Sequence, residues 1–172
     1  VSPHGKMQTF LCVAFAGVGT SIVGARAGSL YVFIGYSAKL VKKGAHQPAP
    51  KGGPMSGGVQ SVTVVGDLVA SGGGLGDGSL KLWAKNNLQH LGTVMLPHTL
   101  PDLGSVRSIY GDSEAHILVG TKLGEIFEVE GGAVKQLVSG HGRVKVRTAD
   151  AGKGSNADDD DDDDVNDDYD DD

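Results

Sequence analysis

The sequence has little cysteine, few aromatic residues and no long apolar run. Cys12 is the single cysteine, so no disulfide can form within the chain, which fits a reducing compartment. Aromatic residues make up 5% of the 172 positions. The apolar opening stretch 10–18 is far shorter than the ~20 residues that a membrane helix needs, and no signal-peptide pattern is found. These absences predict a cytoplasmic protein.

Positive charge is missing from the last part of the chain. Residues 158–172 hold 12 aspartates and no lysine or arginine, whereas all 15 Lys and Arg precede them together with nine Asp and Glu. The body therefore carries a charge of about +6 and the terminal segment −12. Because such a run repels itself and buries no apolar surface, we expect 143–172 to be a disordered, Asp-rich tail. A basic body favours acidic partners, and the tail can compete with them.

Glycine, by contrast, is abundant at 28 residues, which suits short strands joined by tight turns better than a helical bundle. In three segments, a glycine is followed five residues later by a large apolar residue; these segments are 28–33, 78–83 and 124–129. The glycines are 50 and 46 residues apart, close to the ~40–45 residues of a four-stranded propeller blade. The spacing therefore indicates repeated blades.

Three further short apolar segments accompany each glycine segment, so each unit predicts four strands. The expected first strands are 10–15, 59–65 and 106–110; the second are 21–24, 68–72 and 117–120; the fourth are 39–41, 88–94 and 133–138. Proline-containing linkers separate the units. We predict an all-β fold, a partial WD-repeat β-propeller spanning 6–142, with blades at about 8–45, 57–97 and 104–141.

The middle unit carries the most informative motif. The run DGSLKLW resembles the core of a WD repeat, in which a turn Asp, a strand Ser or Thr, a Trp and a preceding His form a hydrogen-bonded set. The resemblance assigns these roles to Asp77, Ser71, Trp83 and His46. Their physical basis is that a buried indole N–H and imidazole need partners. Relative to the common form, two extra residues precede Asp77, and Ala84 replaces the Asp that names the motif.

The outer units match this motif less well. The first has Phe33 at the Trp position and Ala27 at the turn Asp position, and the third has Val129 and Leu123 there. A histidine nonetheless follows each unit. We interpret three histidines as blade-linking residues: His46, His98 and His141.

Three groups of residues narrow the resemblance from WD repeats in general to one family: FLCVAF at 10–15, KLW at 81–83, and VRSI at 106–109 with ILVGTKLGEIFEV at 117–129. In their order and spacing, they resemble the echinoderm microtubule-associated protein-like family over roughly 6–142. That family has tandem propellers that bind tubulin or microtubules, with no known chemistry. The resemblance implies a fragment of a non-catalytic, cytoskeletal scaffold whose basic body suits acidic tubulin. The family's hydrophobic motif and further blades are absent, so a general WD-repeat scaffold with another protein partner is the alternative.

The residues give less support to a chemical site. The glycine-rich segment 72–78 lacks the GxxxxGK[ST] pattern of a phosphate-binding loop. The histidines and Cys12 lack the spacing of metal ligands. The Asp tract lacks the glycine of an EF-hand loop, which leaves only weak, non-specific attraction of divalent cations. No nucleophile elbow or paired carboxylates are found. We therefore expect no enzyme activity, metal, cofactor or membrane contact. Nucleic acid is a lesser alternative, because the basic clusters lack interleaved aromatics.

The predicted blade number has a consequence for assembly. Closed propellers typically use ~4–8 blades, whereas this sequence supplies three. Unpaired strand edges are templates for association. We therefore predict that the chain forms an incomplete stack of blades or associates with another copy.

Overall fold

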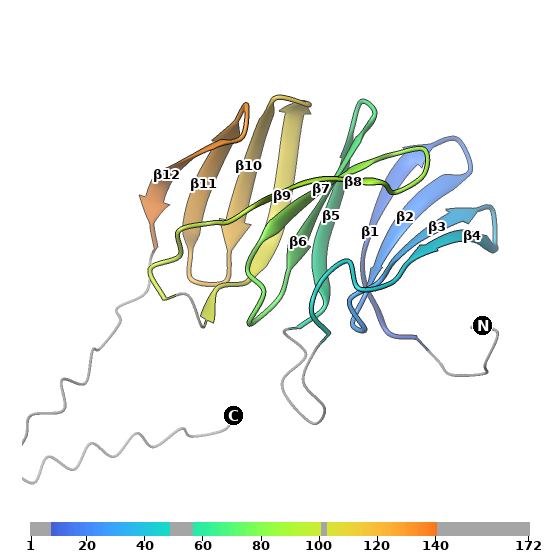
Figure 1. Cartoon of the computed structure of the whole chain (residues 1–172), viewed down its shortest axis with the longest axis horizontal. Coiled ribbons are helices and arrows are strands. Elements are labelled where there is room, and N and C mark those ends of the chain that lie inside the picture. Colours follow the sequence, from blue (N-terminus) through green and yellow to red (C-terminus); the bar gives the residue numbers. More distant parts are fainter. Residues whose placement is uncertain (1–7, 49–56, 101–102, 141–172) are drawn as a thin grey trace, which may run out of the picture. The chain divides into compact units, whose positions relative to one another are not determined.

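A computed structural model describes residues 8–48, 57–100 and 103–140. By its internal contacts the chain separates into two units, 1–142 and 143–172, and the second unit, with the predicted acidic tail, lies outside the described residues. The described residues form twelve strands in three four-stranded antiparallel sheets, each in chain order (Figure 1). The predicted all-β architecture of three four-stranded units is confirmed.

Each sheet forms one blade. Blade 1 contains β1 (Phe10–Gly17), β2 (Thr20–Ala25), β3 (Leu30–Ile34) and β4 (Ser37–Lys42). Blade 2 contains β5 (Val59–Val65), β6 (Leu68–Gly73), β7 (Leu80–Ala84) and β8 (His90–Val94). Blade 3 contains β9 (Val106–Ser113), β10 (His116–Thr121), β11 (Glu125–Glu130) and β12 (Ala133–Ser139).

The glycine repeated in each unit lies in the turn between the second and third strands. Gly28, Gly78 and Gly124 have φ angles of +77°, +51° and +76°. This left-handed region costs little for glycine and is unfavourable for residues with a Cβ. The repeat seen in the sequence is therefore a repeat of one hairpin turn, which positions the third strand beside the second.

One strand begins later than its sequence pattern predicts. The expected strand 88–94 begins at His90, because Leu88 lies in the turn before it with a φ of +52°. The Leu88 side chain is nevertheless almost fully buried, in an apolar cluster with Trp83. Its hydrophobicity therefore reflects packing beneath the turn, not membership of the strand.

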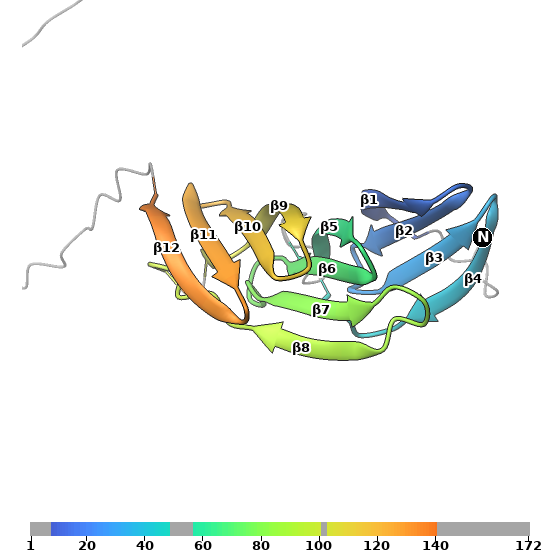
Figure 2. The same ribbon diagram turned by 90° about the horizontal axis from the view of Figure 1, so that it is seen from above.

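Successive blades pack through their first strands. β5 contacts β1 and β2, and β9 contacts β5 and β6, as the view from above shows (Figure 2). Two apolar clusters fill these junctions. One joins blade 1 to blade 2 and includes Ile22, Leu30, Val62 and Trp83. The other joins blade 2 to blade 3 and is made of Leu68, Ala70, Leu80, Leu96, Val106, Ile117, Val119, Phe127 and Val129.

Glycines near the ends of the second strands permit this close packing. A Cβ on Gly24 would overlap the Val59 side chain at 2.6 Å, and a Cβ on Gly72 would overlap Val106. Val59 and Val106 are the first residues of the next blade's first strand, and both are fully buried. The same device therefore sets the approach at both junctions.

Candidate functional site

The junction between blades 1 and 2 brings together the four residues that the WD resemblance singled out. The His46 ring contacts Asp77 Oδ2 through Nδ1 at 2.9 Å and Ser71 Oγ through Nε2 at 2.8 Å. The Trp83 indole N–H donates to the same Ser71 oxygen at 2.8 Å. His46 lies after blade 1, while the other three belong to blade 2. The set therefore links the segment after one blade to the core of the next.

Asp77 is the acceptor at the centre of this junction. It accepts hydrogen bonds from the Ser79 hydroxyl and, at 2.9 Å, from the Gln47 backbone N–H. Burial by itself would raise the pKa of the Asp77 carboxyl, but the bonds from His46, Ser79 and Gln47 outweigh burial and hold the pKa well below its usual range. Asp77 is therefore ionised at neutral pH and fixed in place by neighbouring donors.

A lysine completes the same junction. Lys81 Nζ donates to the Ala45 carbonyl at 2.7 Å and lies 3.9 Å from Asp77 Oδ2. Lys42 Nζ lies 5.7 Å from the centroid of the Trp83 ring, within cation–π range. Polar groups from both blades therefore make structural contacts here.

The junction between blades 2 and 3 contains a second set, of which the sequence pattern predicted His98 alone. His98 Nδ1 lies 2.9 Å from Glu125 Oε2, and its Nε2 donates to the Gly78 carbonyl at 2.7 Å. Thr121 Oγ1 donates to Glu125 at 3.0 Å, and the Thr99 N–H donates to it at 2.7 Å. The His98 ring also meets Phe127 edge-on at 5.6 Å.

Glu125 therefore does in blade 3 what Asp77 does in blade 2, from a different position. Asp77 precedes the turn glycine and Glu125 follows it. Gly120 to Gly124 is two residues shorter than Gly72 to Gly78, and glutamate has one more methylene with which to reach the histidine. A motif that allowed an acidic residue on either side of the turn glycine would have found Glu125.

Burial would raise the pKa of the Glu125 carboxyl, yet the pKa is lowered. The bonds from Thr99, His98 and Thr121 stabilise the charged form more than burial disfavours it. Glu125 is 1% exposed, so these donors are needed to compensate the loss of water around the charge.

The remaining predicted positions are placed as follows. Phe33 pairs with Ser21 in β2 as Trp83 pairs with Val69 in β6, so Phe33 occupies the Trp position. Val129 occupies it in blade 3, where it pairs with Ile117. His141, the third histidine interpreted as blade-linking, lies outside the described residues.

The opposite ends of the strands in blades 2 and 3 are also joined. Glu114 Oε1, from the β9–β10 turn, accepts a hydrogen bond from the Asp67 backbone N–H at 2.6 Å. At the end where β9 begins, which is the same end as Glu125, Arg107 donates to the Gln60 side chain at 3.0 Å. Blade 3 therefore contacts blade 2 at both ends of its strands, through side chains as well as through the apolar core.

The groups considered for chemistry are placed in structural roles. The glycine-rich segment 72–78 forms the end of β6 and the β6–β7 hairpin turn, in which the Asp77 and Gly78 backbone N–H groups donate to the Gly74 carbonyl. Burial raises the pKa of the Cys12 thiol to about 11. Within the described ranges, no group of three His, Cys, Asp or Glu residues is arranged to hold a metal ion. That part of the chain has no helix long and apolar enough to span a membrane.

Comparison with known proteins identifies the fold. No family model matches the chain. Among similar solved structures, Sqt1 of Saccharomyces cerevisiae has 16% identity and a TM-score of 0.63, covering 80% of this chain and 38% of that one. The WD40 repeats of RRP9 have 14% identity and a TM-score of 0.55, covering 72% and 36%. BamB from Moraxella catarrhalis has 14% identity and a TM-score of 0.55, covering 74% and 36%.

These similarities establish the fold and its extent. The three sheets are blades of the WD40 propeller type, as the motif at 77–83 predicts. The chain spans little more than a third of the length of these structures. The resemblance to the echinoderm microtubule-associated protein-like family stays a prediction from the sequence.

Proposed function

We propose that this chain is part of a non-catalytic protein-binding scaffold built from WD-type blades. The observation that carries the proposal is that the buried polar side chains at the blade junctions bond to one another. At both junctions the buried histidine and the buried carboxylate bind each other and nearby donors. These buried groups therefore hold the blades together. The turns at the strand ends are free of this role, so their residues can vary and contact partners.

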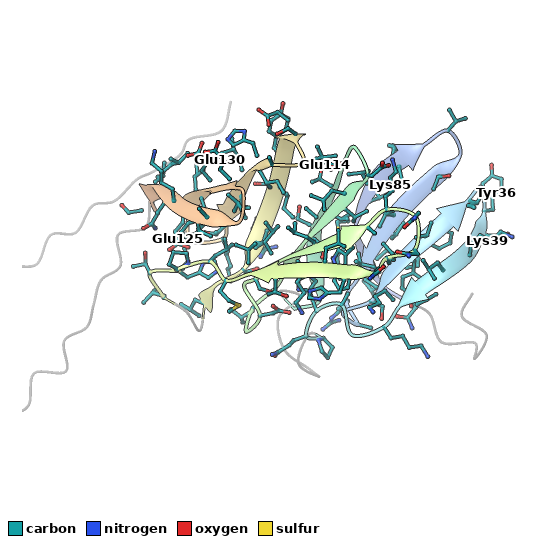
Figure 3. The ribbon with its side chains drawn as sticks, turned by 45° about the horizontal axis from the view of Figure 1, so that its top comes forward. Tyr36, Lys39, Lys85, Glu114, Glu125 and Glu130 are labelled. Atoms are coloured by element: carbon teal, nitrogen blue, oxygen red, sulfur yellow. The ribbon has the colours of Figure 1, made fainter. Side chains whose placement is uncertain are left out.

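The exposed turns of blade 1 are candidates for such contacts. Tyr36, in the β3–β4 turn, has its side chain fully exposed, and Lys39 follows it on β4 (Figure 3). An exposed tyrosine beside lysines combines an aromatic surface with positive charge, and aromatic residues are enriched at protein interfaces.

The finer proposal is that the partner is tubulin or a microtubule, which would place the protein in the cytoplasm at the cytoskeleton. Two observations support it: the family resemblance of 10–15, 81–83 and 106–129, and the charge of blade 1. Residues 8–48 contain four basic residues and no acidic one. Because tubulin is acidic, such a blade would be attracted to it at low salt.

One binding experiment distinguishes a tubulin-binding scaffold from a scaffold for another protein. The full chain is titrated with tubulin dimers and, in parallel, with an unrelated protein of similar negative charge. Saturable binding to tubulin alone, weakened by Lys39→Glu with Lys43→Glu, would support the finer proposal. Equal binding to both proteins would contradict it, because charge alone would then explain the attraction. Binding to neither would also contradict it, leaving a scaffold for another protein. Lys122→Glu with Lys135→Glu, which changes the charge equally at exposed positions of blade 3, is the control variant.

A further inference from the structure

Each blade has two faces, and the register of the strands defines which residues share them. We call the face toward the following blade the leading face and the opposite one the trailing face. In blade 1 the leading face contains the row Ala14, Ile22, Val32 and Leu40, all of which belong to the cluster shared with blade 2. In blade 2 the corresponding row is Thr63, Ala70, Leu82 and Gly92, in which Ala70 and Leu82 pack toward blade 3.

The trailing faces of blades 2 and 3 complete these junctions. In blade 3 the trailing row is Ile109, Val119, Phe127 and Gln136. Phe127 and Val119 are fully buried against blade 2. In blade 2, Val62 and Trp83 of the trailing face are buried against blade 1. A leading face therefore packs on a trailing face twice within this chain.

Blade 1 has a trailing face of the same kind with no blade packed on it among the described residues. Its central row is Val13, Val23, Tyr31 and Val41, one residue from each strand. Phe10 packs its ring edge-on against Tyr31 and Phe33 on this face. Phe15, Val13, Phe10 and Val41 are 83%, 58%, 47% and 41% exposed. This is an apolar, aromatic surface of the kind that marks an interaction site.

Blade 3 has the complementary face, its leading face, on which no blade of the described part of the chain packs. The central row there is Tyr110, Leu118, Glu128 and Lys135. Tyr110 is 64% exposed, and Ile126, one step along the sheet, is 38% exposed. Asp112 and Glu128 flank the apolar residues and contact His116. Among the described residues, one trailing face and one leading face are therefore left unpaired, the two halves of the junction that the chain already makes twice.

The charges of the two end blades also differ in sign. Blade 1, over 8–48, carries four basic and no acidic residues. Blade 3, over 103–140, carries five acidic and three basic residues. Opposite net charge favours contact between blade 1 of one molecule and blade 3 of another, and disfavours contact between two copies of blade 1.

We propose that the chain associates with a second copy head to tail, with the trailing face of blade 1 docking on the leading face of blade 3 of the other molecule. The contact repeats the packing of blade on blade within the chain. It is heterologous, so it leaves one face of each kind free on a dimer and permits further copies to add.

Sedimentation velocity of the full chain over a wide range of concentration tests the proposal. We expect the wild type to form dimers and larger species as concentration rises. Phe15→Asp, on the trailing face of blade 1, and Tyr110→Asp, on the leading face of blade 3, should each be monomeric alone. Both positions are well exposed, so neither change should unfold its blade. Circular dichroism and the unfolding midpoint confirm that each variant is folded.

Mixing the two variants distinguishes head-to-tail from symmetric association. Phe15→Asp retains the leading face and Tyr110→Asp retains the trailing face, so an equimolar mixture should form a dimer and nothing larger. Val18→Asp, fully exposed in the β1–β2 turn, should assemble like the wild type. A wild type that stays monomeric would overturn the proposal. So would a Tyr110→Asp variant that still dimerises alone, or a mixture that stays monomeric.

Discussion

The two blade junctions reach the same arrangement with different residues. At the first, His46 binds an aspartate before the turn glycine and a serine that also accepts from an indole. At the second, His98 binds a glutamate after that glycine and packs on a phenyl ring. Both histidines are at least 95% buried at the side chain. The comparison teaches that a junction needs a buried histidine bound to an ionised acid, while the acid's position and the aromatic partner can vary.

The largest expected effects come from removing the aromatic residue at each junction. Trp83→Ala and Phe127→Ala should each lower the free energy of unfolding by about 3–5 kcal/mol, because each leaves a cavity in a packed cluster. Urea unfolding followed by circular dichroism measures both. Leu91→Ala, at an exposed position of β8, should change stability by less than about 0.5 kcal/mol.

The polar part of the first junction can be separated from its packing. Trp83→Phe, Ser71→Ala and the double variant form a cycle that isolates the bond between the indole N–H and Ser71 Oγ. We expect a coupling of about 0.5–1.5 kcal/mol. Additive effects within error would show that the tryptophan contributes by packing alone, and the two junctions would then be alike.

The sequence predicts the first junction better than the second for a physical reason. Asp77, Ser71 and Trp83 have spacings set by two neighbouring strands, so a motif can recognise them. At the second junction, the shorter turn shifts the acid, Glu125, to the other side of the glycine. A fixed motif position, Leu123, therefore misses it.

Apolar runs and turn glycines locate the strands. Apart from the last strand of blade 2, each strand lies at its predicted segment, with ends that differ by a few residues. Leu88 shows what such patterns cannot decide. A buried leucine in a turn with positive φ has the same hydrophobicity as one in a strand. The pairing of free faces likewise depends on register across four strands, which spacing along the chain does not reveal.

Neutralising the acid at each junction should have the next largest effect. Asp77→Asn and Glu125→Gln keep the side-chain size but remove the charged acceptor, so each should lower the free energy of unfolding at neutral pH by about 1.5–3 kcal/mol. Thermal or urea unfolding measures both. Asp67→Asn, whose side chain is 94% exposed, is the matched control and should have little effect.

The lowered pKa values of Asp77 and Glu125 predict how the stability of the same variants depends on pH. Because both pKa values are lowered in the folded state, each carboxylate contributes its full stabilisation above its unfolded pKa of about 4. That contribution is lost as pH falls through the folded pKa. The difference between wild type and either variant should therefore shrink below about pH 4. A difference that stays constant from neutral pH to strong acid would contradict ionised acids at the junctions.

Glycine at the end of the second strand gives a smaller effect that depends on the junction. Gly72→Ala should cost about 1–3 kcal/mol, because the new Cβ overlaps the buried Val106 of the next blade. Gly120→Ala, at the equivalent position of blade 3, meets only Ser108 Oγ, the end of a side chain that can rotate away. It should be nearly neutral. Equal costs measured by urea unfolding would show that strand geometry, and not blade packing, requires the glycine.

The smallest effect is expected outside the junctions, at His116 on the leading face of blade 3. Its ring contacts Asp112 at 2.9 Å and Glu128 at 3.0 Å, and these carboxylates raise the pKa of His116 while the pKa of Asp112 is lowered. A raised pKa stabilises the fold below the unfolded value of about 6.5, and this stabilisation is lost as pH rises through the folded pKa. His116→Gln should therefore be less stable than wild type near pH 5.5 and equal to it near about pH 8.5. His90→Gln is the control, since His90 contacts Thr93 and not a carboxylate. An equal difference between His116→Gln and wild type at both pH values would show that the His116 side chain stabilises the fold by packing. The ion pairs of His116 with Asp112 and Glu128 would then not contribute, unlike the buried histidine–acid pairs at the junctions.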